Sequence, residues 1–427
     1  MWASAALGVV GADALWLVPL GDRIVHGDLP GSIPYATAPS NGWHDVPAGG
    51  QVVFFAFYRA FGGDRGLVLA QALAAAVGLG ALAHGLARQA ARGAVLLVAA
   101  LVVVGALPGF AVTNVSLFSL ALFPVLLGLL ESEADAPGRR IWLAVPLIAV
   151  WGNLHGAVLA GWALLACYLL VGRVRRRPAE SAAVLAGATL ALFANPELWQ
   201  TPRYYWSVFG NEAARQGTGL WTPLRGRVFD LLLVAVFVLF AALASRRGLR
   251  LRAWEAVAVV GLAAATVHVA RNGVWLLCVA AYPASRSLEL RGPRVGTAAL
   301  VAGALGVAAV AGIVEGPRHP GAAALAHRAA RTGEPVLADS LLGQQVALAG
   351  GRVWLNNPLD AFARRDQRLY LAWLRGRPGG DGAVSHASLV LVEAGTSAAR
   401  RARGDARLVQ VASGGGGVLF RVRAEPS

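Results

Sequence analysis

The first residue with the chemistry for catalysis is Asp13, a carboxylate near the end of the apolar run that opens the chain. Trp16 follows it, and the segment GDRIVHGDLP then adds two aspartates, Arg23 and a histidine to the same loop. Ionisable groups at membrane depth are energetically costly and are functional candidates for that reason. A carboxylate held where lipid meets water can serve as the general base for an acceptor hydroxyl. The alternative is a helix-end residue that is hydrated by the loop or paired with Arg23.

A second cluster is formed by His44 and Asp45 in the segment NGWHDVPAGG. A histidine beside a carboxylate is typical of a base with its orienting group, or of half a metal site. However, adjacent side chains usually point apart, and a turn rich in Gly and Pro favours Asp and Asn for conformational reasons. A divalent metal is compatible with these residues but unsupported, because the sequence has no DxD motif.

Two further pairs of polar residues interrupt apolar tracts. Asn153 and His155 break the run IWLAVPLIAVWGNLHGAVLAGWALLACYLL. Irregular backbone at membrane depth is tolerated only where it is buried in protein or lines a polar cavity, so this break predicts the border of a cavity. The alternative is a histidine that only bonds a neighbouring helix. Arg271 and Asn272 lie between two other apolar runs, and the guanidinium of Arg271 suits a lipid phosphate.

The elements that must position these residues are membrane-spanning helices. The chain has 427 residues, of which 56% are hydrophobic and only 14% charged, and its mean hydropathy is +0.57. This composition excludes an ordinary soluble enzyme. A spanning helix needs about 20 mostly apolar residues. We predict about eleven such segments, at 1–19, 66–88, 93–108, 112–131, 141–153, 157–171, 181–195, 229–244, 254–270, 273–285 and 296–314.

The arginines orient these segments. The net charge is +15, and the sequence contains no lysine, so all 38 basic residues are arginine. The predicted cytoplasmic loops hold 15 of them, although they are much shorter than the opposite loops, which hold 8. Basic residues accumulate in short cytoplasmic loops, so we predict a cytoplasmic N-terminus and an extracytoplasmic C-terminal domain. Nucleic-acid binding is excluded, because the basic residues are scattered over separate loops on two sides of a membrane.

The predicted domains are a polytopic all-α membrane domain at 1–314 and a small α/β domain at 315–427. Two long outer loops, 20–65 and 196–228, belong to the first domain, and the stretch QVVFFAFYRAF at 51–61 suggests an interfacial helix. Short apolar runs at 335–339, 352–357, 388–393, 407–412 and 417–422 alternate with helical patterns, which is typical of an α/β domain. The glycines at 414–417 indicate a hairpin-like connection. Because Met1 is the only methionine and Asp13 follows it closely, a start further upstream remains an alternative.

In this order, the pieces resemble bacterial multi-pass proteins related to the GT-C glycosyltransferases, which use polyprenyl-phosphate-linked sugars. The matching stretches are DALWLVPLGDRIVHGDLPGSIPYATAP with Trp43, WGNLHGAVLAG, ANPELW with GLWTPL, HVARNGVWLL and VWLNNPLDAF. The resemblance implies a catalytic carboxylate in the first outer loop, matched by Asp13, and an Asn-Leu-His element, matched by Asn153 and His155. It also implies a lipid-phosphate donor that enters from the bilayer of the bacterial inner membrane.

Three places depart from that family's pattern. The chain has VPAGG instead of a Glu-Trp pair after Trp43, Asn114 and Val115 instead of Arg-Pro, and Asn356, Asn357 and Pro358 instead of Asp-Gly-Arg. These departures leave a divergent or inactive member as an alternative.

We therefore expect a membrane glycosyltransferase that transfers a sugar from a polyprenyl-phosphate donor to an acceptor hydroxyl at the outer face. Asp13 is the expected base and Asp45 the second choice. The expected substrate- and donor-binding residues are Arg271, Asn272, His155, Asn153, Trp43 and His44. The alternative is a non-catalytic or transport-related membrane protein for lipid or glycan handling, or an assembly partner. The acceptor, whether glycan, lipid or protein, is not specified by the sequence.

Overall fold

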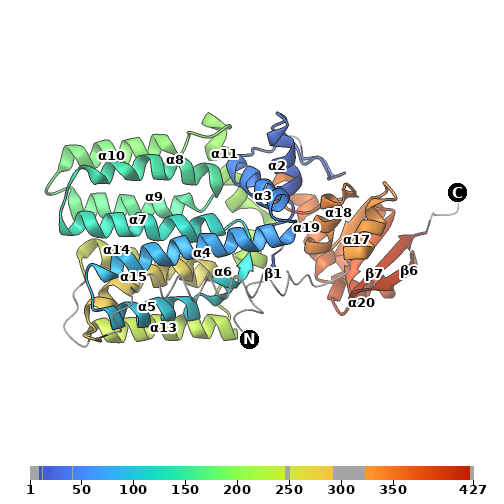
Figure 1. The fold of residues 1–427 in the computed structure, drawn as a ribbon. Helices are drawn as coiled ribbons and strands as arrows, with labels where there is room; N and C mark the ends of the chain where they lie inside the picture. Colours follow the sequence, from blue (N-terminus) through green and yellow to red (C-terminus); the bar gives the residue numbers. More distant parts are fainter. Residues whose placement is uncertain (1–8, 12, 41, 246–250, 292–322, 424–427) are drawn as a thin grey trace. The chain divides into compact units, whose positions relative to one another are not determined.

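The computed structural model describes residues 9–11, 13–40, 42–245, 251–291 and 323–423 (Figure 1). These residues form two compact units. Unit 1 contains Asp64–Leu198 and the described residues of 217–291. Unit 2 contains Val10–Gly63, Trp199–Gln216 and the described residues of 323–423. Each unit is described separately.

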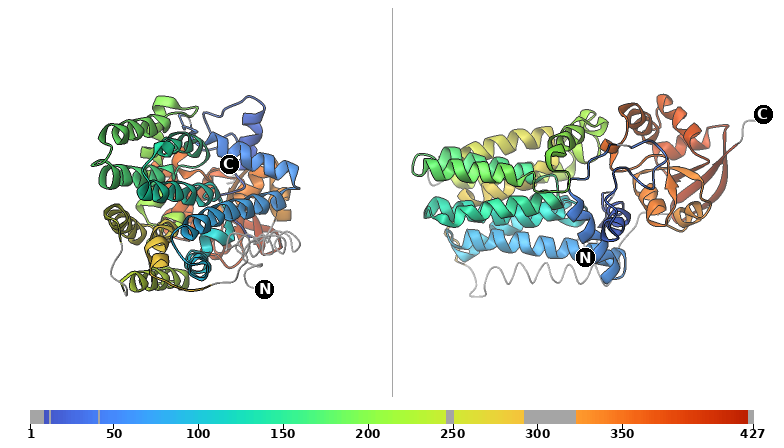
Figure 2. Two further views of the ribbon diagram at one scale, coloured as in Figure 1. Left: turned by 60° about the vertical axis from the view of Figure 1, so that its left-hand side comes forward. Right: turned by 90° about the horizontal axis from the view of Figure 1, so that it is seen from above.

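Unit 1 is a bundle of helices that run alongside one another (Figures 1 and 2). Within the described residues, each of the nine predicted apolar segments between 66 and 285 contains a helix. The α-helices of unit 1 are α4 (Asp64–Ala87), α5 (Arg92–Gly105), α6 (Leu107–Ala111), α7 (Leu117–Asp135), α8 (Ala144–Leu154), α9 (Val158–Cys167), α10 (Pro178–Ala191), α13 (Val228–Ser245), α14 (Ala253–His268) and α15 (Gly273–Arg286). The shorter elements are β2 (Val112–Thr113), the 3₁₀ turns η1 (Arg139–Leu143), η4 (Gly219–Trp221) and η5 (Ala270–Asn272), and the π-helix η2 (Tyr168–Arg173).

Several helices of unit 1 have the apolar composition of membrane-spanning helices. Among the described residues, α4, α7 and α13 are long and apolar enough to cross a membrane. Shorter apolar helical segments are Arg92–Gly105, Val158–Arg173 and Ala253–His268. On α13 and α14, large apolar side chains such as Val238 and Val260 are more than half exposed. Because water would penalise such a surface and lipid would not, we identify the chain as a membrane protein.

One end of unit 1 is held by buried ion pairs. Arg252, at the start of α14, pairs with Glu131 of α7 at 2.9 Å and with Asp135 at 2.5 Å. On α15, Arg286 pairs with Glu255 of α14 at 2.6 Å. The Glu255 side chain has no exposed area and that of Glu131 is 2% exposed. These residues come from the ends of helices that border three predicted cytoplasmic loops, so the structure gathers those loops at the same end of the bundle.

The prediction of a helix over 1–19 is wrong for its described part. β1 (Val9–Val10) is followed by a turn that includes Asp13, and α2 begins only at Leu17 and ends at Val25. Pro19 lies in the first turn of α2, where its missing N–H costs nothing, whereas in a longer helix its ring would clash with the preceding turn. Residues 1–8 and the predicted segment 296–314 lie outside the described residues.

Unit 2 contains a five-stranded mixed sheet in the order β4-β3-β5-β7-β6. Strands β3 and β4 and strands β3 and β5 are parallel, while β7 is antiparallel to both β5 and β6. This confirms an α/β fold for the C-terminal segment, with each predicted strand and helix near its expected place. The strands are β3 (Pro335–Ala338), β4 (Arg352–Val353), β5 (Leu389–Glu393), β6 (Leu408–Gly414) and β7 (Gly417–Val422). The helices are α17 (Ala323–Ala330), α18 (Ser340–Leu348), α19 (Arg364–Leu374) and α20 (Ser397–Arg403), with the 3₁₀ turns η6 (Leu359–Ala361) and η7 (Pro378–His386).

The connection between β6 and β7 is the predicted hairpin. Its two central residues, Gly415 and Gly416, have φ angles of 55° and 82°. Both lie in the left-handed region that the two-residue hairpin turn requires and that glycine adopts without a steric penalty.

Two segments from the predicted outer loops complete unit 2. The first carries α2 (Leu17–Val25) and α3 (Ala48–Ala60), and the second carries α11 (Thr201–Gly210) and α12 (Glu212–Arg215) after η3 (Leu198–Gln200). The first segment extends the sheet, because Ala36 forms a parallel bridge with Val353 of β4. The second is tied to α19, whose Arg368 pairs with Glu212 at 3.1 Å.

Candidate functional site

Asp13 lies in the turn before α2 and is held by the segment that follows β4. The side-chain amide of Asn357 donates a hydrogen bond of 2.7 Å to Oδ1 of Asp13. The hydroxyl of Tyr35 donates to the backbone carbonyl of Asn357 at 2.8 Å, which fixes that asparagine in turn. Arg23, the alternative partner considered for Asp13, forms an exposed pair with Asp28 at 3.3 Å. Asp13 is therefore a positioned carboxylate.

A second carboxylate, Asp360 in η6, lies within electrostatic reach of Asp13. Burial raises the pKa of Asp360 to about 6, and the negative charge of Asp13 contributes in the same direction. Its own backbone N–H and the neighbouring Trp43 indole oppose this increase of the pKa. When two neighbouring carboxyl groups have different environments, one can be ionised and accept a proton at neutral pH while the other is protonated and donates a hydrogen bond.

Asp360 lines a cavity of about 570 Å³ whose lining residues all belong to unit 2. The polar and aromatic side chains around it are those of Trp43, His44, Arg203, Ser207, Asp360 and Phe362. Small-molecule sites are concave, fall in this range of volumes and combine apolar walls with a few convergent polar groups. A tryptophan face, a carboxylate and a guanidinium form a surface suited to the apolar faces and hydroxyl groups of a sugar.

Asp45 lies away from the lining of this cavity. It has no exposed area, and its Oδ1 accepts a hydrogen bond of 2.6 Å from the side chain of Gln51 in α3. Burial, together with the charge of Asp45, raises the pKa of Tyr35 well above its usual value, so this tyrosine stays protonated. The geometry favours a positioning role for Asp45: it contacts α3 and influences the tyrosine that holds Asn357.

Four predicted site residues belong to unit 1. Asn153 lies in the last turn of α8 and donates to the backbone carbonyl of Ala149 at 2.9 Å and to that of Ala194 at 2.5 Å. His155 follows α8, and its Nδ1 is 2.6 Å from the hydroxyl of Ser119 in α7. The break in the apolar tract therefore lies against two neighbouring segments of the bundle.

Arg271 lies in η5, between α14 and α15. Its guanidinium carbon is 4.3 Å from the centroid of the Trp221 ring, a cation–π arrangement. Its positive charge acts on His155, so the two residues share one region of unit 1. Asn272 donates to the carbonyl of Ala265 at 3.1 Å and ties this turn to α14. The exposed guanidinium is thus held on an aromatic face near a histidine.

The structure thus divides the predicted residues between the units. Unit 2 contains Asp13, Trp43, His44 and Asp45, while unit 1 contains Asn153, His155, Arg271 and Asn272. Within the part of the chain that the structure describes, no group of three His, Cys, Asp or Glu side chains could hold a metal ion.

Sequence reasoning missed Asp360 and Arg203. Asp360 is the carboxylate in the VWLNNPLDAF stretch, and this acidic residue within a stretch that resembles the family could have indicated it. Arg203 had no comparable signal, because it is one of several arginines in an outer loop.

Comparison with solved structures identifies two similar folds. The arabinofuranosyltransferase AftD from Mycobacteria matches 99% of this chain with a TM-score of 0.52 and 17% sequence identity. The chain spans only 41% of the length of that protein. ArnT from Cupriavidus metallidurans, in a structure bound to undecaprenyl phosphate, matches 98% of this chain and 95% of its own length, with a TM-score of 0.57 and 15% identity. No family model and no curated protein matches the sequence. The chain therefore shares its fold with these two solved proteins only at low sequence identity, and the likeness is one of fold.

Proposed function

We propose that this protein is a membrane glycosyltransferase that transfers a sugar from a polyprenyl-phosphate donor to an acceptor hydroxyl at the outer face of the membrane. The observation that carries the proposal is the approach of two carboxylates, Asp13 and Asp360, beside a sugar-sized cavity lined by Trp43 and Arg203. A passive assembly partner has no need for a carboxylate whose charge raises the pKa of a second carboxyl group beside a cavity.

In the proposed reaction, the oxygen of the acceptor hydroxyl attacks the anomeric carbon of the donor sugar. The bond between that carbon and the phosphate oxygen breaks, and polyprenyl phosphate leaves with the bonding electrons. Asp13 accepts the proton of the hydroxyl, because the amide of Asn357 holds its carboxylate in one orientation. Asp360 and Trp43 bind the sugar hydroxyls and ring in the cavity. Asp45 keeps the surrounding loop in place.

Binding of the lipid phosphate is proposed for unit 1. Arg271 supplies the guanidinium, which pairs with phosphate oxygens in a bidentate manner. Its stacking on Trp221 restricts the side chain before the lipid arrives, so less conformational entropy is lost on binding. His155, Asn153 and Asn272 shape the same region. The printed ligand of the ArnT structure, undecaprenyl phosphate, supports a donor of this class.

The test of this function uses purified protein in lipid vesicles. Undecaprenyl-phosphate-linked sugars, including an arabinofuranose, are supplied with a membrane extract as the source of acceptors, and release of undecaprenyl phosphate is measured. We expect Asp13→Asn to reduce this release by roughly 10²–10⁴-fold, the usual contribution of a general base.

Asp28→Asn is the matched control, because Asp28 is an aspartate in the same segment but is 57% exposed and paired with Arg23. It should retain full activity. Undiminished release in folded Asp13→Asn would refute the assignment of the base. Absence of release by the wild-type protein with every sugar donor would refute the transferase itself.

A further inference from the structure

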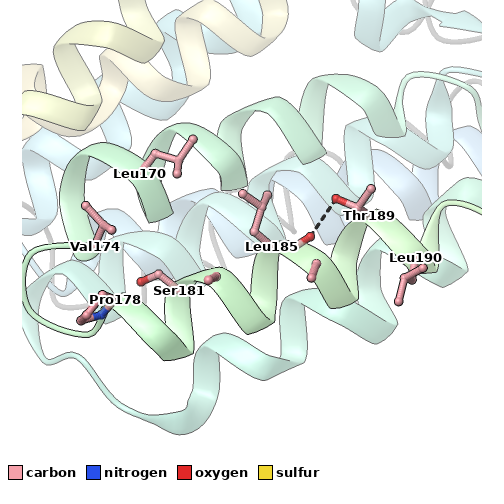
Figure 3. A pocket seen from close by; sticks show the side chains of 9 residues that line it. Leu170, Val174, Pro178, Ser181, Leu185, Thr189 and Leu190 are labelled. Atoms are coloured by element: carbon pink, nitrogen blue, oxygen red, sulfur yellow. Dashed lines mark hydrogen bonds between the residues drawn. The ribbon is translucent and has the colours of Figure 1, made fainter.

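An open apolar groove lies on unit 1, between the end of the α9 segment and α10 (Figure 3). Its volume is about 540 Å³. Leu170 and Val174 line it from the side of the π-helix η2, while Leu185 and Leu190 line it from α10. Leu170 and Leu190 are 56% and 65% exposed. A groove with such walls has the chemistry of a site for a hydrocarbon chain.

A cluster of arginines lies in the loop that joins two of the groove's lining residues. Val174 and Pro178 both line the groove, and the three residues between them are Arg175, Arg176 and Arg177, all exposed. The groove therefore passes directly from apolar walls to a cationic loop. This combination of an apolar slot and a basic end is complementary to an anionic lipid, whose chains and headgroup have the same polarity pattern.

The carboxylates near this loop are already used by other arginines. Buried Arg173 pairs with Glu133 at 2.5 Å and with Glu180 at 2.8 Å, and Arg177 shares Glu180 at 3.1 Å. In the described part of the chain, the ion pairs found in this loop thus involve Arg173 and Arg177. Arg175 and Arg176 contribute positive charge that these two carboxylates do not offset.

Ser181 marks a polar point inside the groove. It lies on the first turn of α10 and lines the groove, and only 2% of its surface is exposed. Its hydroxyl oxygen is buried and has no hydrogen-bond partner among the described residues. A buried hydroxyl without a partner is energetically unfavourable. The hydroxyl would reach an acceptor oxygen of a ligand, such as the glycerol ester of a phospholipid, only after the Ser181 side chain rotates toward the groove.

We propose that this groove binds an anionic phospholipid of the membrane, with an acyl chain between η2 and α10 and the phosphate at Arg175 and Arg176. The site is separate from the sugar-transfer residues and does not depend on the proposed function. According to the distribution of arginines, the loop at 174–178 lies on the cytoplasmic side, where bacterial anionic phospholipids are available to it.

The experiment measures binding of phosphatidylglycerol and phosphatidylcholine to the delipidated full-length protein in detergent by native mass spectrometry. We expect phosphatidylglycerol to be retained in preference to phosphatidylcholine. Arg175→Gln combined with Arg176→Gln should weaken phosphatidylglycerol binding about 25-fold, since each cation near a headgroup contributes about fivefold. The matched control, Arg88→Gln with Arg92→Gln, removes two exposed arginines from another loop and should leave this binding unchanged.

A second pair of variants tests the groove with every charge in place. Ala182 is exposed and lines the groove, whereas its neighbour Ala183 is exposed but does not line it. Ala182→Trp should prevent retention of the lipid and Ala183→Trp should not. The proposal is overturned if the Arg88→Gln/Arg92→Gln control weakens phosphatidylglycerol binding as much as Arg175→Gln/Arg176→Gln does. It is also overturned if Ala182→Trp retains the lipid like the wild type, because only nonspecific surface charge would then attract the lipid. Formation of a dimer through this face without any effect of lipid would also overturn it.

Discussion

Asp360 shows how a single residue responds to its surroundings in unit 2. Its side chain is partly covered, one carboxylate oxygen is inaccessible, and the charge of Asp13 lies nearby. All three conditions disfavour the ionised form. The same carboxyl group in the unfolded chain titrates near its ordinary pKa of 3.8. The folded protein therefore binds this proton more tightly than the unfolded chain does.

The pH dependence of stability follows from that difference. Below about pH 4 the carboxyl is protonated in both states, so its stabilising contribution is complete there; the contribution is lost as the pH rises through about 6. The stability of Asp360→Asn relative to the wild type should therefore increase as the pH rises from 4 to 7, by at most about 3 kcal/mol. Thermal unfolding in detergent at several pH values measures the difference, with Asp28→Asn as the control. A difference that stays constant with pH would contradict the prediction.

At the scale of elements, the ion pairs joining α7, α14 and α15 illustrate the cost of buried charge. Glu255 has no exposed area, and Arg286 is its partner at 2.6 Å. Removing only the arginine leaves a carboxylate with reduced compensation in a low-dielectric environment. An exposed pair such as Arg23 with Asp28 is instead compensated by water.

Arg286→Met should consequently lower the free energy of unfolding of unit 1 by about 3–5 kcal/mol. Arg23→Gln should change the stability by about 1 kcal/mol or less. The double variant Arg286→Met/Glu255→Leu should recover much of the loss, because no isolated charge then remains. Denaturation monitored by tryptophan fluorescence or circular dichroism distinguishes these outcomes. A single variant no less stable than Arg23→Gln would show that the pair does not hold the helices.

The elements themselves were largely predictable from the sequence. Apolar length indicated α4, α7 and α13, and alternating apolar runs indicated the strands of unit 2. The helix predicted over 1–19 was wrong because its apolar composition does not determine where a helix begins. The polar turn at Asp13 and Pro19 in the first turn of α2 place the start of the helix at Leu17 instead. The partners of Asp13 could not be predicted, because Asn357 is 344 positions away and no local pattern reports such a contact. For the same reason Asp360, although present in a noted stretch, was not identified as part of the site.

At the scale of the whole molecule, unit 2 is assembled from three distant parts of the chain. The bridge between Ala36 and Val353 and the ion pair between Glu212 and Arg368 connect these parts. In unit 1, in contrast, the buried ion pairs described above join helices that all belong to unit 1. The two units should therefore respond differently to loss of the C-terminal segment.

Deletion of residues 323–427 tests this difference. We expect the truncated protein to be cut rapidly by trypsin after Arg59 and Arg203, because their segments lose the sheet and α19. Cleavage after Arg139 in unit 1 should keep its wild-type rate. Mass spectrometry of the fragments over time measures both rates, and the full-length chain is the control. Equal protection of Arg59 and Arg203 in both proteins would show that the two segments fold without the C-terminal segment.

The contact between Asp13 and Asn357 also has a consequence for biosynthesis. A ribosome adds about 5–20 residues per second, so Asn357 is made roughly 20–70 seconds after Asp13. Throughout that interval the helices of unit 1 can enter the membrane while the carboxylate has no partner from the C-terminal segment. A nascent chain would consequently be inserted before Asp13 is positioned, and the contact that orients this carboxylate would form only after Asn357 has been synthesised.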